Sequence, residues 1–353
     1  MSVCVAALSE DQKAIVCIAD KALSYGDAIQ WDSDTSKIIR LGKNGPLVLF
    51  AGDEDATTRV LAGLLARAND FGNDKSRAEI LRGCEKEYKA AMEELVEAQF
   101  LTPRLLRMED YRAAITAPPV INPYMTALAD EIKSYEMKCQ LLVCGFASDG
   151  LPYILTLVNP GIATDMTQTG FHAIGSGWEK AIAKLLFSEY KRSYRLHRTM
   201  YDAFDAKAFA EMAVGVGYAW DSQIVTKDRI WEIPKEVREL IEKGWAKATR
   251  SPFEKYNAKE DVPPPPKDWI KTLDSYFRLL IENPDALSAM SAKLGPMVSL
   301  VVKGDAATEP KLMSSEDLRR VRKMMKFGEE MNEKIEQAKS TAPSTSQTSE
   351  PEP

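Results

Sequence analysis

The sequence predicts an α+β fold: two stacked antiparallel sheets flanked by helices, a four-layer αββα sandwich, with a helical C-terminal extension. Two observations predict it. Short apolar runs come in pairs joined by polar or glycine-containing turns, which is typical of hairpins and therefore of antiparallel sheets. These pairs alternate with segments in which apolar residues recur every three to four positions, as in helices that cover a sheet.

The strand-like segments form three hairpins and two later strands. The segments are 3–8 with 13–19, 37–41 with 47–51, and 140–146 with 153–158, then 171–174 and 223–233. Helical spacing begins at Asp55, and again near Ser76 after the breaker Gly72-Asn73-Asp74. A third helix follows Gly175-Ser176-Gly177, and a last one is expected at about 205–218.

Composition along the chain predicts four regions. Residues 1–235 form the main domain, with an irregular, proline-containing insertion at about 102–135. Residues 236–266 read as a linker that ends in four prolines, a stiff spacer because proline fixes φ and lacks an N–H. A mostly helical extension is expected over 267–338. The Ser-, Thr- and Pro-rich tail at 339–353 is expected to be disordered.

Charge and composition exclude several function classes. The 353 residues are 45% hydrophobic and 28% charged with a net charge of −6, which argues against binding to nucleic acid or to an anionic membrane. No apolar run reaches the ~20 residues of a membrane span. The first residues lack the pattern of a secretory signal, so a cytoplasmic location is expected. The five cysteines form no CxxC pair and the two histidines have no ligand spacing, so no metal or cofactor is expected.

The start of the chain offers a candidate nucleophile. Ser2 becomes the first residue if Met1 is removed, and an N-terminal hydroxyl then has a base built in. The α-amine has a reference pKa of about 8, so part of it is neutral at physiological pH and can accept the hydroxyl proton. Because many proteins begin Met-Ser, this feature alone equally fits an ordinary chain start.

Three further residues lie at strand ends, where they could converge on Ser2. Asp20 ends the second strand-like segment and Lys37 begins the third. Gly52 follows the fourth and precedes a helix, where a backbone N–H can face a developing oxyanion. Singly, Asp20 fits a turn and Lys37 a solvated strand end, so only their joint order and spacing favour a site.

Several short motifs occur together in the order of a known family. They are 2–6 (SVCVA), 18–20 (IAD), 37–41 (KIIRL), 50–52 (FAG), 142–146 (LVCGF) and 173–177 (AIGSG). This set resembles the proteasome β-subunit family of N-terminal-nucleophile (Ntn) hydrolases. It is closest in style to the bacterial ancestral-β-subunit proteins and to the peptidase of the two-component heat-shock protease. The resemblance covers roughly 2–233, and the C-terminal third has no counterpart.

The resemblance implies a role for each matching residue. Ser2 matches the terminal nucleophile, Lys37 the lysine that eases its deprotonation, Asp20 the acid that orients this lysine, Gly52 the oxyanion donor, Ser176 the serine near the amine and Asp221 the second acid. The Ser-Gly-Gly pattern that follows this second acid in the family is missing here. Leu23, Ile39 and Phe50 match apolar substrate-binding positions, and Glu54 nearby could favour a basic side chain.

The function that the resemblance implies is peptide-bond hydrolysis by a self-assembling peptidase. The expected substrate is a peptide or unfolded protein, and the expected assembly is a homo-oligomeric ring or spiral with or without an ATPase partner. Two alternatives stay open, because one fold can host several activities. The chain could be an inactive assembly or interaction module, or an amidase that acts on small molecules.

Overall fold

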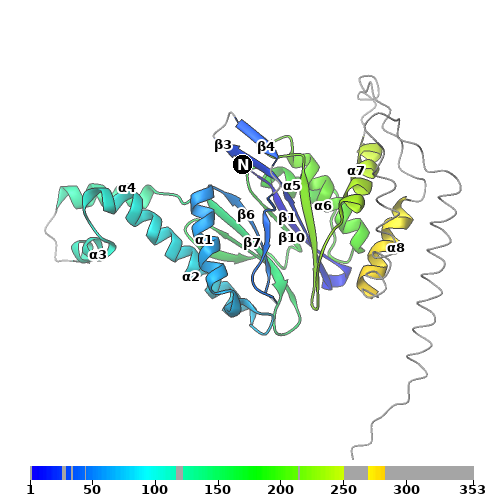
Figure 1. The fold of residues 1–353 in the computed structure, drawn as a ribbon, viewed down its shortest axis with the longest axis horizontal. Coiled ribbons are helices and arrows are strands. Elements are labelled where there is room, and N and C mark those ends of the chain that lie inside the picture. Colours follow the sequence, from blue (N-terminus) through cyan, green and yellow to red (C-terminus); the bar gives the residue numbers. More distant parts are fainter. Residues whose placement is uncertain are drawn as a thin grey trace, which may run out of the picture. The chain divides into compact units, whose positions relative to one another are not determined.

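The computed structural model describes residues 2–25, 29–32, 35–43, 45–116, 122–213, 215–249 and 269–282 (Figure 1). The chain divides into two units, Met1–Lys267 and Asp268–Pro353. All the strands described below belong to the first unit. In the second unit, the described part is one helix, α8 (Trp269–Glu282).

Two five-stranded sheets form the centre of the first unit, and all strand neighbours within them are antiparallel. Sheet 1 has the order β10 (Phe171–Ile174), β1 (Cys4–Ser9), β2 (Ala14–Asp20), β11 (Trp220–Thr226), β12 (Ile230–Glu232). Sheet 2 has the order β5 (Ile38–Arg40), β6 (Leu47–Gly52), β7 (Cys139–Phe146), β8 (Pro152–Val158), β9 (Ile162–Asp165). The three predicted hairpins are β1–β2, β5–β6 and β7–β8.

Apolar side chains from both sheets meet in a shared core. Alternate residues of β1 and β2, such as Cys4, Ala6 and Cys17, pack in one cluster with Leu49 and Leu142 of sheet 2. Because side chains alternate between the faces of a strand, the intervening residues face the helices instead. Burial of both faces explains why β1 and β2 read as continuous apolar runs.

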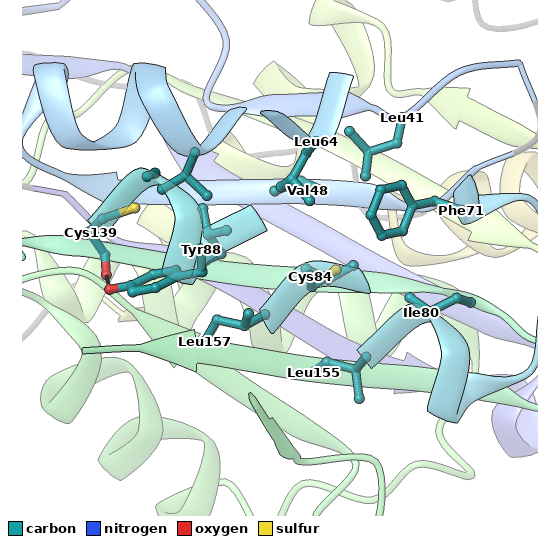
Figure 2. Close-up of a cluster of buried hydrophobic side chains, with 14 of the residues drawn as sticks. Leu41, Val48, Leu64, Phe71, Ile80, Cys84, Tyr88, Cys139, Leu155 and Leu157 are labelled. Atoms are coloured by element: carbon teal, nitrogen blue, oxygen red, sulfur yellow. Dashed lines mark hydrogen bonds between the residues drawn. The ribbon is translucent and has the colours of Figure 1, made fainter. Parts of the chain in front are cut away.

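A helical layer covers the outer face of each sheet. Helices α1 (Glu54–Ala66) and α2 (Arg77–Val96) contact sheet 2, and α5 (Trp178–Phe187) and α6 (Leu196–Ala210) contact sheet 1 (Figure 1). The predicted start near Ser76 is confirmed: Ser76 caps α2 and forms a capping box with Glu79. Figure 2 shows the apolar cluster between α1, α2 and sheet 2. The four layers give the predicted αββα sandwich.

The structure differs from the sequence expectations in several segments. The insertion predicted to be irregular contains α3 (Met108–Thr116) and α4 (Pro123–Ser134), which lie beyond the C-terminal end of α2 (Figure 1). The helix expected at about 205–218 is α6, which begins nine residues earlier than expected, at Leu196, and ends at Ala210. A short hairpin of β3 (Ala22–Tyr25) and β4 (Ile29–Asp32) was not predicted. The segment predicted as a linker begins with α7 (Lys235–Thr249).

Most of the predicted C-terminal regions lies outside the described residues. Of the helical extension at 267–338, the structure describes α8 alone, and the predicted tail at 339–353 is not described. Within the described part of the chain, no helix has the length and hydropathy needed to cross a membrane.

Candidate active site

Ser2 and Lys37 form the centre of the candidate site. Ser2 precedes β1 and Lys37 precedes β5, so each sheet contributes one of them. The Lys37 ammonium Nζ donates a hydrogen bond of 2.7 Å to the Ser2 hydroxyl Oγ, and both residues are only 5% exposed. A buried ammonium at this distance polarises the hydroxyl and stabilises the alkoxide that forms when the proton leaves.

Asp20 holds the ammonium in place. Its Oδ1 accepts from Lys37 Nζ at 3.0 Å and from the Val3 N–H at 2.8 Å. Its Oδ2 accepts from the N–H groups of Ala22 at 3.2 Å and Gly217 at 3.0 Å. Asp20 is fully buried, and these four donors compensate the cost of removing a carboxylate from water. The carboxylate is therefore fixed from several directions.

The three protons of the Lys37 ammonium match three acceptors. Besides Ser2 Oγ and Asp20 Oδ1, Nζ donates to the carbonyl of Ala22. A lysine ammonium has three donors and no acceptor, so this set uses its full capacity. As long as it is charged, Lys37 cannot accept the Ser2 proton. The arrangement can stabilise an alkoxide, but the base must be another group.

Strand register explains why these residues meet. In the β1–β2 hairpin, Cys4 lies opposite Ala19, so the residues before β1 come beside Asp20 at the end of β2. The Asp20 N–H donates to the Val3 carbonyl at 3.0 Å and extends this pairing toward Ser2. Hairpin geometry therefore brings together two residues that are eighteen positions apart in the sequence.

The turn between β10 and α5 holds the backbone of Ser2. The Ser2 nitrogen donates to the Ser176 hydroxyl at 3.2 Å, and the Gly177 N–H donates to the Ser2 carbonyl at 3.2 Å. Gly175 has φ +92°, and a Cβ there would lie 2.2 Å from the Ser2 carbonyl oxygen. Only glycine allows this approach. The structure thus places the predicted residue Ser176 next to the Ser2 nitrogen.

Gly52 ends β6, at the same end of sheet 2 as Lys37. Two residues before it, the Phe50 N–H donates to the Lys37 carbonyl at 3.2 Å. Gly52 has φ +131°, and a Cβ there would lie 2.1 Å from the Lys138 carbonyl oxygen. The position therefore requires glycine. Gly52 is exposed and directly precedes the N-cap of α1, Asp53.

Asp221 lies outside the hydrogen-bond network around Ser2 described above. In β11 it pairs with Ala19 of β2, and its carboxylate contacts Arg238 of α7 at 2.8 Å and Lys21 at 3.5 Å. The structure thus gathers Ser2, Asp20, Lys37 and Ser176, and it gives Asp221 a separate set of partners.

The four residues predicted to bind substrate differ in their exposure. Ile39 and Phe50 are half-buried and pack against the same cluster beneath α1 and α2. Leu23 is 38% exposed on β3, and Glu54 is exposed at the first position of α1.

Sequence reasoning missed Gln140 and Gly217. The Gln140 side-chain oxygen Oε1 accepts from the Gly175 N–H at 2.7 Å, which links β7 of sheet 2 to the turn that holds Ser2. Gln140 is opposite Ala51 in the ladder, next to Gly52. A polar residue at the start of an otherwise apolar strand was the available signal. The Gly217 N–H donates to Asp20, but nothing in the local sequence, apart from the glycines around it, marked this residue as part of the site.

Cys4 is the other nucleophilic side chain near Lys37. It is fully buried, and its thiol donates to the Phe50 carbonyl at 3.4 Å. Burial raises the pKa of the Cys4 thiol well above its ordinary value, despite the opposing effect of Lys37, so the unreactive thiol form dominates at neutral pH. Among the described residues, no cluster of His, Cys, Asp and Glu could hold a metal ion.

The sequence and the structure were compared with known proteins. No protein-family model matches the sequence, and no curated protein matches it. Among solved structures, the chain is similar to eukaryotic HslV from Trypanosoma brucei, with 16% identity and a TM-score of 0.38, over 64% of this chain and 99% of that chain. A similarity of this size carries no argument about activity.

Proposed function

We propose that the chain is an N-terminal-nucleophile peptidase whose nucleophile is Ser2 after removal of Met1. The observation that carries the proposal is the buried contact of 2.7 Å between Lys37 Nζ and Ser2 Oγ, with Asp20 at 3.0 Å from the same ammonium. A buried charge beside a hydroxyl is costly to maintain, and stabilising an alkoxide gives it a chemical use.

In the proposed acylation step, Ser2 Oγ attacks the carbonyl carbon of a peptide bond. Its proton passes to the freed α-amine, directly or through one water, because the charged Lys37 cannot take it. Lys37, held by Asp20, stabilises the developing alkoxide. The tetrahedral oxyanion accepts from the Gly52 N–H, a contribution typically of ~3 kcal/mol.

The amine then returns its proton to the leaving nitrogen, and the peptide C–N bond breaks. A water, activated by the same amine, attacks the ester and releases Ser2. Ser176 supports the amine, because its hydroxyl already accepts from the Ser2 nitrogen. Asp221 supports this end of the site indirectly, through its ion pair with Arg238.

The proposal extends to substrate and assembly through the motif resemblance in the sequence. The substrate is a peptide or an unfolded protein, recognised in part by Leu23, Ile39, Phe50 and Glu54. The active form is a homo-oligomeric ring or spiral in the cytoplasm. Light scattering tests the assembly, and a clean monomer would contradict it.

Two measurements test the nucleophile. Intact mass of the purified protein should be lower than the full sequence by one methionine. A tripeptide vinyl sulfone with apolar side chains should then modify Ser2, and Ser2→Ala should not react. Ser9→Ala is the matched control and should react like the wild type, because Ser9 is a buried serine at the opposite end of β1.

The outcomes separate the alternatives. Retained Met1 would block the amine and favour an inactive assembly or interaction module. Labelling of Ser2 without hydrolysis of any peptide library would favour an amidase acting on small molecules. Equal labelling of the wild type and Ser2→Ala would remove Ser2 as the nucleophile.

A further inference from the structure

A second buried lysine, Lys207 on α6, is not used by the proposed chemistry. Lys207 is fully buried, and its ammonium Nζ donates to Glu211 Oε1 and to the Tyr218 carbonyl, both at 2.6 Å. Glu211 directly follows α6, and Tyr218 lies two residues before β11. One ammonium thus holds both ends of the chain segment that returns from α6 to sheet 1.

This return segment, residues 211–213 and 215–219, contacts the candidate site at several points. The Gly217 N–H donates to Asp20 Oδ2 at 3.0 Å, and the Ala219 carbonyl accepts from the Lys21 N–H at 2.8 Å. Val216 packs close to Gly177, where an added Cβ would lie 3.0 Å from Val216 Cγ2. The segment therefore touches both the carboxylate that holds Lys37 and the turn that holds Ser2.

A contribution to stability does not by itself explain this ion pair. Removing two charges from water costs several kcal/mol per ion, and well-packed apolar residues of similar size often serve as well or better. An apolar side chain, however, cannot donate to the Tyr218 carbonyl. If an apolar pair replaced Lys207 and Glu211, the hydrogen bond to the Tyr218 carbonyl would be lost, and this bond fixes the return segment.

We propose that Lys207 is a positioning residue for the site: it acts through the return segment to hold the Gly217 N–H on Asp20, and thereby sets Lys37 against Ser2. This role rests on the proposed function, since it assumes that the contact between Lys37 and Ser2 is used in catalysis. Lys207 itself does not touch the reacting atoms.

The test compares charge removal with loss of the hydrogen bond. The double variant Lys207→Met with Glu211→Leu removes the buried ammonium together with its partly buried partner, so it should unfold within a few degrees of the wild-type melting temperature. The rate of Ser2 modification by the tripeptide vinyl sulfone should fall about tenfold or more, the usual effect of losing a charge-assisted hydrogen bond. Amide hydrogen exchange in the return segment should become faster.

Lys184→Met is the control on the same helical layer. It removes an ammonium that pairs with Asp205 at 2.9 Å and that is not part of the contacts of the return segment described above. Both its labelling rate and its exchange in the return segment should match the wild type. Lys207→Arg keeps the charge but not the shape of the donor. Ser2 of the Lys207→Arg variant should be labelled more slowly than Ser2 of the wild type. If the double variant does not fold, this labelling rate tests the proposal instead.

Each result is decisive. Unchanged exchange in the return segment would show that Lys207 does not hold it. Faster exchange with wild-type labelling would show that it holds the segment without positioning the site, and either result overturns the proposal. If the wild type itself is never labelled, the proposed peptidase function fails, whereas the exchange data still report whether Lys207 holds the segment.

Discussion

The two helical layers bury different kinds of side chain. Between α1, α2 and sheet 2, the cluster is formed by apolar residues such as Leu64, Ile80 and Leu155, and the Tyr88 hydroxyl donates to the Cys139 carbonyl at 2.7 Å (Figure 2). On the other side of the molecule, α6 buries two aspartates and one lysine, Asp202, Asp205 and Lys207.

The buried charges of α6 are part of a set of directional contacts. Asp205 pairs with Lys184 and accepts from the Trp245 indole N–H of α7 at 2.7 Å. Arg238 of α7 holds Asp221 of β11, and Lys207 holds the return segment. Apolar burial is non-directional, whereas hydrogen bonds and ion pairs fix distances and angles. The comparison teaches that the α1–α2 layer is held mainly by non-directional apolar burial, whereas the α5–α6 layer is also held by directional contacts, of which those made by Lys207 fix the segment that touches the candidate site.

Ile80→Ala should have the largest effect on stability. It removes a fully buried side chain from the α1–α2 cluster, so the unfolding free energy should fall by about 2–5 kcal/mol in a denaturant titration. Well below the melting temperature, the labelling rate of Ser2 should stay at the wild-type value. Leu65→Ala, at an exposed position of α1, is the control and should change stability far less. A matching fall in labelling rate would contradict the division between the layers.

Sequence pattern was sufficient for the elements that depend on local signals. Alternation and turn residues located the three hairpins, and Ser76 with Glu79 fixed the start of α2, because a capping box is formed within four residues. Ser2, Asp20 and Lys37 were proposed because they occur at strand ends, in order, among motifs that resemble those of the proteasome β-subunit family. The hairpins and the start of α2 could be predicted from neighbouring residues, whereas the proposal of these three residues depended on that resemblance.

The remaining features depend on contacts that are distant in the sequence. The hydrogen bond from Gly175 to Gln140 spans 35 positions, and the one from Gly217 to Asp20 spans 197. Helix α7 was predicted to be part of a linker. Its Arg238 and Trp245 bind partners on β11 and α6, and these contacts cannot be inferred from the local sequence. Local propensity is a weak prior that tertiary contacts override. Such residues become visible only once the sheets are assembled.

Gln140→Leu should have an intermediate effect, and it tests whether one cross-sheet hydrogen bond also fixes the site. Loss of the bond to the Gly175 N–H should cost about 1 kcal/mol of stability and slow Ser2 labelling about tenfold. Ser9→Ala removes one partly buried hydrogen bond, to the Tyr194 carbonyl, at the far end of β1. It should cost similar stability and leave labelling unchanged. Equal labelling rates for Gln140→Leu and the wild type would confine the geometric role to the α5–α6 side.

Asp202→Asn should give the smallest effect on stability, and the size of this effect should depend on pH. Burial raises the pKa of Asp202 above its ordinary value of 3.8, and Arg198, whose Nε donates to Oδ2 at 2.9 Å, only partly opposes this. Nearby Asp205 adds to the increase and Lys184 reduces it. A carboxyl whose folded-state pKa is raised favours folding below its unfolded-state pKa, and this contribution is lost as the pH rises through the folded-state pKa.

The neutral amide of Asp202→Asn avoids that loss. Its melting temperature should therefore exceed that of the wild type at pH 7.5, by an amount equivalent to less than about 1 kcal/mol, and the difference should vanish as the pH approaches 4. Asp130→Asn, at an exposed position of α4, is the control and should show no such dependence. A constant difference across this pH range would mean that packing of the amide, rather than ionisation, sets the effect. Ionisation of buried Asp202 would then not lower the stability of the fold.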